Sequence, residues 1–416
     1  MASTSLTGSV TGSRLLPLAL AGLALAGCGG GGAHGGGGGG GSGGGRERGG
    51  GGSSSTPALV QNAERKKPRP APTPTALMTT KNTTRVGGRN AIADAAAVAR
   101  AVYPARTPET RPEAVVLVDS GDWRAAISAA QLMSAPLRAP LLYSTGSDLP
   151  AATRQALHDL APTGADKADG AQVIRVGDAP APEGLKSIRL QGGTPAALAR
   201  AIDRLHTRAA GHSSPAAVVA PEGRAPLAMP AAGWAAKSGE PVLWAGKAAL
   251  PRDTVAALEA DRRPRIYVLG PPEAISDSVL ARLRRVGATK RIGTGDPIAN
   301  AIFFARYADG AFGWNVVDPG HGLVFANLHR TGDAAAAAPL SASGTWGPLL
   351  LVSDAAALPG PVQEYLLDIQ PGYDKDPVRG VYNHGWFVGD ESAISADVQS
   401  RIDALLEIQP VDTGGE

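Results

Sequence analysis

The stretch that decides the fold is PLLYSTGSDLP, residues 140–150, because it recurs twice further along the chain. It returns as PVLWAGKAALP at residues 241–251 and as PLLLVSDAAALP at residues 348–359. The two prolines that frame it stand ten, ten and eleven residues apart. In each copy an apolar run predicts a buried strand, and after a short loop the second proline predicts the first turn of a helix, where a missing backbone N–H costs nothing. The predicted helices cover 151–160, 252–260 and 360–369.

We call the stretch 140–150 and its two recurrences, 241–251 and 348–359, the landmark stretches. The segments on both sides of each landmark recur as well. Each repeat opens with a short strand ending in glycine, at 84–88, 188–193 and 290–295. A helix, an apolar strand and an alanine-rich helix then lead to the landmark, and a strand ending in glycine closes the repeat. Such periodicity is typical of repeat proteins, and strands that alternate with helices pair in parallel. We therefore predict an α/β fold of three tandem parallel-sheet repeats: repeat 1 at 83–187, repeat 2 at 188–287 and repeat 3 at 288–410.

The N-terminal residues 1–28 are typical of a lipoprotein signal peptide. An apolar run of about 12 residues follows Arg14, short of the roughly 20 that span a bilayer. Cys28, the only cysteine, comes directly after small residues, so we predict its lipidation; a signal cleaved elsewhere is the alternative. Residues 29–82 are rich in Gly and Ser and then in Pro, which predicts a disordered tether. The expected location is the cell envelope, on the outer face of the cytoplasmic membrane.

The repeats resemble the cell wall-binding repeat 2 family of Gram-positive bacteria. The similarity rests on the opening at 84–88, the strand and helix at 115–130, the Pro-Leu-Leu strands and the ending at 270–277, and it covers about residues 83–410. It implies pseudo-threefold packing of the repeats and, as partner, a cell-wall polymer: an anionic polysaccharide or a peptidoglycan-linked polymer. The Pro-Ile-Leu-Leu motif that the family links to polymer binding falls on Leu141 and Leu142, Val242 and Leu243, and Leu349 and Leu350.

Three arginines hold equivalent places before the glycine of each repeat opening: Arg85, Arg189 and Arg291. An anionic polymer requires Lys or Arg donors close to ordered backbone N–H groups, so these arginines are candidate ligand-binding residues. A solvated or structural arginine is the alternative interpretation. The motif side chains lie in apolar strands, so we expect them to belong to the hydrophobic core. Any contact with a ligand would then be made by nearby loops.

Repeat 3 gathers residues that could form a catalytic or metal site: Asp318, His321, His329, His384 and Asp390. Histidine beside a carboxylate can bind zinc or transfer protons, but no HExxH helix, GxSxG elbow or P-loop accompanies them. We therefore expect a non-enzymatic protein without cofactor or metal. A wall-modifying enzyme with its site in repeat 3 stays open, as does a solute-binding lipoprotein, which would form two large lobes. The small, uneven net charge of +3 does not indicate nucleic acid.

Overall fold

The computed structural model describes residues 77–344 and 346–411. The predicted signal peptide, Cys28 and the tether up to residue 76 lie outside the described residues. Residues 77–82, which we also assigned to the tether, differ from that prediction. They carry the strand β1 (Leu77–Thr79), which pairs antiparallel with β2 (Thr83–Val86), and the Asn82 amide N–H donates to Asp403 at 2.7 Å.

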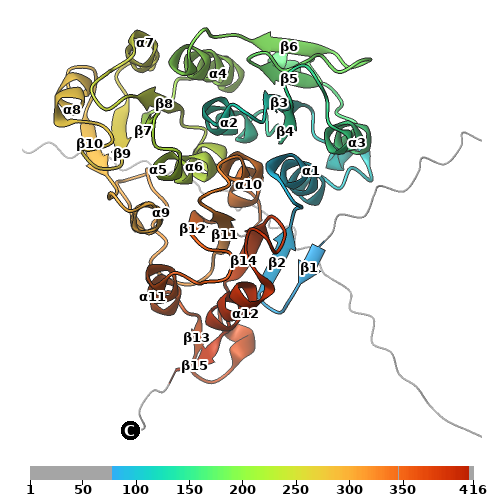
Figure 1. Cartoon of the computed structure of the whole chain (residues 1–416), viewed down its shortest axis with the longest axis vertical. Helices are drawn as coiled ribbons and strands as arrows, with labels where there is room; N and C mark the ends of the chain where they lie inside the picture. Colours follow the sequence, from blue (N-terminus) through green and yellow to red (C-terminus); the bar gives the residue numbers. More distant parts are fainter. Residues whose placement is uncertain (1–76, 345, 412–416) are drawn as a thin grey trace, which may run out of the picture. The chain divides into compact units, whose positions relative to one another are not determined.

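Three separate sheets, one for each repeat, form the framework of the described chain (Figure 1). Sheet 1 has the order β4 (Leu141–Ser144), β3 (Val115–Asp119), β5 (Val173–Val176), β6 (Ser187–Leu190). Sheet 2 has the order β10 (Thr289–Ile292), β9 (Arg265–Leu269), β7 (Ala216–Pro221), β8 (Val242–Ala245). Sheet 3 has the order β1, β2, β14 (His384–Val388), β11 (Gly322–Asn327), β12 (Leu349–Val352). Every pair in these sheets except β1 with β2 is parallel, so the predicted α/β fold with three parallel-sheet units is confirmed.

The opening strand of each repeat pairs with the sheet of the preceding repeat. Strand β6 opens repeat 2 but pairs with β5 of sheet 1, and β10 opens repeat 3 but pairs with β9 of sheet 2. Strand β2 opens repeat 1 and pairs with β14 of sheet 3, with Thr84 opposite Trp386. The three units therefore form a closed cycle in which the start of the described chain completes the sheet near its end. The landmark strands β4, β8 and β12 occupy the opposite edge of each sheet.

Helices that precede the landmark strands meet in the middle of the three sheets (Figure 1). They are α2 (Trp123–Ala129) with the 3-10 turn η2 (Ala130–Met133), then α5 (Ala225–Ala228) with α6 (Pro230–Ser238), and finally α10 (Asp333–Ala342). Helices α6 and α10 contact each other and η2. Residues 334–338 are all alanine and almost fully buried, and such small side chains let helix backbones approach closely. Alanine-rich helices are thus placed where three units share one core.

The first helix of each repeat bridges two units. Helix α1 (Ala91–Val102) contacts α10, α4 (Pro195–Ala210) contacts α2, and α9 (Pro297–Arg306) contacts α5. Their starts are set by side-chain caps: Asn90, Thr194 and Asp296 each accept the backbone N–H three residues further on. The same kind of contact thus recurs at all three junctions, which leaves one unit of three sheets and not the two lobes of the solute-binding alternative.

The outer helices follow the landmark strands. They are α3 (Ala151–Leu160), α7 (Arg252–Ala260) and α11 (Gly360–Asp368). Pro150, Pro251 and Pro359 are the N-cap residues of these helices, one position earlier than predicted, and their carbonyls accept first-turn N–H groups at 2.9 to 3.2 Å. Repeats 2 and 3 end with α8 (Asp277–Leu283) and α12 (Ala396–Leu405), whereas repeat 1 has only the loop 177–186 there.

The remaining elements are short: η1 (Pro108–Thr110), η3 (Asp166–Ala168), η4 (Pro377–Arg379), and the paired strands β13 (Gly372–Tyr373) and β15 (Gln409–Pro410). None of the helices in the described part of the chain is both long and apolar enough to cross a bilayer.

Candidate functional site

The three arginines of the repeat openings each make the same kind of contact. Arg85 Nη1 donates to the carbonyl of Gly389 at 3.1 Å, Arg189 Nε to that of Gly177 at 2.7 Å, and Arg291 Nη1 to that of Gly270 at 3.0 Å. In each case the acceptor is the glycine directly after the neighbouring parallel strand. A carbonyl at a strand end has no ladder partner, so a guanidinium on the adjacent strand satisfies it. The recurrence therefore reflects how a unit joins the preceding sheet.

The arginines lie on three different sheets and differ in exposure. Arg85 is 6% exposed, donates to Gln399 and lies over the Phe387 ring, and burial lowers its pKa, opposed by Glu391 and Asp390. Arg189 and Arg291 are more accessible and form ion pairs with Asp178 and Asp277. A binding role for these arginines stays a prediction; their observed contacts are structural.

The motif side chains belong to the core. Leu141, Leu142, Val242, Leu243, Leu349 and Leu350 are each at most 1% exposed. Strands β4, β8 and β12 are edge strands whose side chains pack against helices, as those of β4 do against α1 and α3. A ligand therefore cannot reach these side chains without rearrangement of the core.

The histidines and acids of repeat 3 have separate partners. His321 Nε2 lies 3.5 Å from Asp318, and His384 Nε2 lies 3.1 Å from Thr84 Oγ1. The His329 backbone N–H donates to Asn327, while Asp390 faces Arg330 at 3.8 Å. Burial lowers the pKa of His384, partly opposed by Asp403. Across residues 77–344 and 346–411 no three His, Cys, Asp or Glu side chains are grouped so that they could hold a metal ion.

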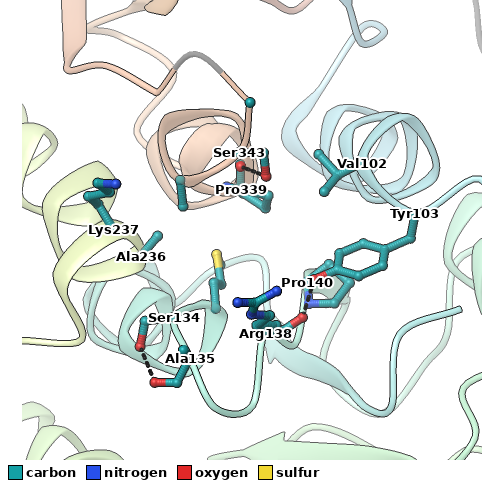
Figure 2. Close-up of a pocket in the computed structure, with 13 residues that line it drawn as sticks. Val102, Tyr103, Ser134, Ala135, Arg138, Pro140, Ala236, Lys237, Pro339 and Ser343 are labelled. Atoms are coloured by element: carbon teal, nitrogen blue, oxygen red, sulfur yellow. Dashed lines mark hydrogen bonds between the residues drawn. The ribbon is translucent and has the colours of Figure 1, made fainter. Parts of the chain in front are cut away.

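A pocket of about 500 Å³ opens where the central helices of the three repeats end (Figure 2). It takes side chains from the last turns of α1, α6 and α10 and from the segment between η2 and β4. The lining residues are Val102, Tyr103, Met133, Ser134, Ala135, Arg138, Pro140, Ala236, Lys237, Pro339, Ala342, Ser343 and Gly344. We call it the central pocket. Pro140, the first residue of the landmark stretch, is part of its wall.

Two cations reach the central pocket, and its lining contains no Asp or Glu. Figure 2 shows Arg138 extending into the pocket, with Lys237 on the α6 side. Arg138 has a left-handed backbone with φ of 47°, and its carbonyl accepts a hydrogen bond from the Tyr103 hydroxyl. Its backbone N–H donates to Ser134 at 2.8 Å. These two bonds hold Arg138 in a conformation that few non-glycine residues adopt.

Neither cation has an anionic partner. Arg138 is exposed, and its guanidinium makes no hydrogen bond or ion pair with the described residues. The Lys237 ammonium lies over the Trp346 ring, 4.1 Å from its centroid. Partial burial lowers the pKa of Lys237. An acid-free pocket with two unpaired cations is suited to an anion, because charge-assisted hydrogen bonds to a carboxylate or phosphate are among the strongest that proteins form.

Ser134 and His206 form a pair at the pocket wall that is not arranged for nucleophilic catalysis. His206 Nε2 lies 2.9 Å from Ser134 Oγ and 3.1 Å from the carbonyl of Ala135. A carbonyl only accepts, so Nε2 carries the proton and cannot take one from Ser134. The Ser134 hydroxyl instead donates to the carbonyl of Gln131 at 2.7 Å. Burial lowers the pKa of His206, which favours the neutral ring.

Sequence reasoning did not single out Arg138 or Lys237. A signal for them exists: Arg138 stands two residues before Pro140, and Lys237 four residues before Pro241, so both precede the first proline of a landmark. The convergence of these two positions on one pocket depends on how α6 and η2 pack, which the linear pattern does not contain.

Comparison with solved structures finds the same fold elsewhere. The chain is similar in fold to two proteins of one bacterium. For Cwp8 from Clostridium difficile the TM-score is 0.60 at 17% identity, covering 79% of this chain and 52% of that one. For Cwp6 from Clostridium difficile the TM-score is 0.63 at 17% identity, covering 79% of this chain and 48% of that one. The chain thus spans about half the length of both. No family model and no curated protein matches it.

Proposed function

We propose that this chain is a non-enzymatic envelope protein whose three repeats bind an anionic polymer of the cell wall, and that the central pocket receives an anionic group of that polymer. The observation that carries the proposal is the pair Arg138 and Lys237, unpaired cations in an acid-free pocket. The fold shared with Cwp8 and Cwp6 and the resemblance to cell wall-binding repeats support the choice of a wall polymer over other anions.

The pocket suits one repeating unit of a polymer. A volume of about 500 Å³ lies in the range of small-molecule sites and is large enough for a sugar-sized group. A long polymer presents many copies of the same anion, so a modest affinity at one pocket is raised by rebinding along the chain. The proposed location is the cell envelope, with Cys28 as the lipidated anchor.

The test is binding of the full chain carrying Cys28→Ala to purified cell walls, with and without their anionic polymers. The substitution removes the proposed lipid, so membrane fragments cannot account for retention. We expect retention on complete walls only, and loss of most of it in the Arg138→Gln, Lys237→Gln double variant. Arg284→Gln, Lys247→Gln is the matched control, because both side chains are exposed and lie outside the pocket lining.

Two results would contradict the proposal. Equal retention of the double variant and its control would show that the central pocket does not hold the polymer. If the parent chain is retained on neither wall preparation, the proposed function is refuted. Wall turnover that depends on His321 and His384 would favour an enzyme in repeat 3.

A further inference from the structure

Lys237 belongs to two features at once. Its side chain lines the central pocket, and its ammonium covers the ring of Trp346, which lies just beyond the pocket residue Gly344. This ring is the only partner that the ammonium has in the described part of the chain. The flexible side chain of Lys237 therefore contacts both the central pocket and the face of the Trp346 ring.

Trp346 stands at the outer end of a row of aromatic residues. Its ring centroid is 6.1 Å from that of Trp314 and 5.6 Å from that of His321, and Trp314 in turn lies 5.3 Å from Trp234. Trp234 and Trp314 are about 95% buried or more, whereas Trp346 is partly exposed. The inner rings hold Trp346 in place, so its position does not depend on Lys237.

The contact between Lys237 and Trp346 is weaker than the one an anion would offer. A cation over an aromatic face at an accessible site gains less than a charge-assisted hydrogen bond to a carboxylate or phosphate. An anion bound to Arg138 would therefore draw the Lys237 ammonium toward itself. That movement uncovers the face of Trp346 at the edge of the pocket.

An uncovered indole face next to an anion site defines a ligand with two parts. The apolar C–H face of a sugar ring can pack on the indole, while the anionic group of that ring occupies the anion site. We propose that the Lys237 ammonium leaves the Trp346 ring and binds the anionic group of the ligand. Trp346 then stacks on the sugar ring that bears this group, so the site selects anionic saccharides over bare anions.

This inference rests on the proposed function, because it assumes that the pocket takes an anion. The test is a titration of the full chain carrying Cys28→Ala, followed by intrinsic tryptophan fluorescence. The probes are glucose 6-phosphate, glucuronate, inorganic phosphate and glucose. We expect both anionic sugars to bind and to change the tryptophan emission, inorganic phosphate to bind roughly three- to tenfold more weakly, and glucose not to bind measurably. The stronger of the two anionic sugars identifies phosphate or carboxylate as the favoured group.

Variants separate the stacking from the anion site. Trp346→Leu should abolish the emission change and bring sugar phosphate down to the affinity of inorganic phosphate, which calorimetry measures without fluorescence. Trp386→Leu is the control, because Trp386 is also partly buried but lies on β14, outside the pocket lining. Thermal unfolding of both variants establishes that they are folded. Lys237→Gln should weaken all anions alike.

The outcomes distinguish the two proposals. If no anion binds, the proposed function of the pocket fails. If inorganic phosphate binds as tightly as the sugar phosphate, or if Trp346→Leu retains the preference for sugar, the pocket function survives and the role of Trp346 is refuted.

Discussion

Replacing Asp333 by asparagine should stabilise the protein at neutral pH. Asp333 is the first residue of α10, and its side chain is fully buried. Arg330 Nε lies 2.8 Å from Asp333 Oδ2, yet neither Asp333 oxygen accepts a hydrogen bond of good geometry within the described residues. Burial, and next the charge of Asp94, raise its pKa from 3.8 to about 9, opposed by Arg330. The Arg330 guanidinium is shared with Asp94, with which it also forms an ion pair.

The magnitude follows from the raised pKa. A pKa of about 9 keeps Asp333 protonated in the folded chain at pH 7, whereas the unfolded chain carries it ionised. Each pH unit above the unfolded pKa, up to the folded pKa, costs about 1.4 kcal/mol. The penalty is on the order of 4 kcal/mol at pH 7. Because the folded pKa lies above the unfolded one, this penalty is absent below about pH 4 and grows as the pH rises toward about 9. Asp333→Asn should remove that slope and recover about 1–3 kcal/mol, the remainder being lost with the Arg330 contact.

Urea unfolding at several pH values measures the effect. The control is Asp397→Asn, an exposed acid in the first turn of α12, which should change the free energy of unfolding by less than about 0.5 kcal/mol. If Asp333→Asn destabilises the protein at pH 8, or leaves the pH dependence of stability unchanged, then Asp333 is ionised in the fold and the reasoning is wrong.

Three further predictions concern the closure of the repeats and the buried motif side chains. Arg85→Ala should cost about 2–4 kcal/mol in urea unfolding, because it leaves the buried carbonyl of Gly389 without a donor; a loss as small as that of an exposed arginine would contradict this. Gly87→Ala should destabilise by about 2 kcal/mol or more, since φ is 142° and the new Cβ would lie 2.4 Å from Asp94 Oδ1; an unchanged melting temperature would refute it. Leu142→Ala should lower the free energy of unfolding by about 2–5 kcal/mol, because its side chain is buried in the core. Wall retention well below the melting temperature should stay intact; a selective loss of retention would show that Leu142 takes part in binding.

The repeat pattern determined much of the local structure. Helices α3 and α7 have the predicted bounds, and the three sheets and their parallel pairing follow from strands that alternate with helices. These features depend on contacts a few residues apart and on the period of apolar residues, both of which are written along the chain. The equivalence of Arg85, Arg189 and Arg291 was visible for the same reason.

What those arginines do, and where the candidate site lies, only the tertiary structure decided. Strand β2 finds its partner β14 about 300 residues away, so the acceptor of the Arg85 guanidinium belongs to another repeat. Arg138 and Lys237 sit on different repeats and meet because helices pack around a shared core. Pairing between distant segments is set by the burial of surfaces that fit one another in space, and a linear period carries no record of which surfaces those are.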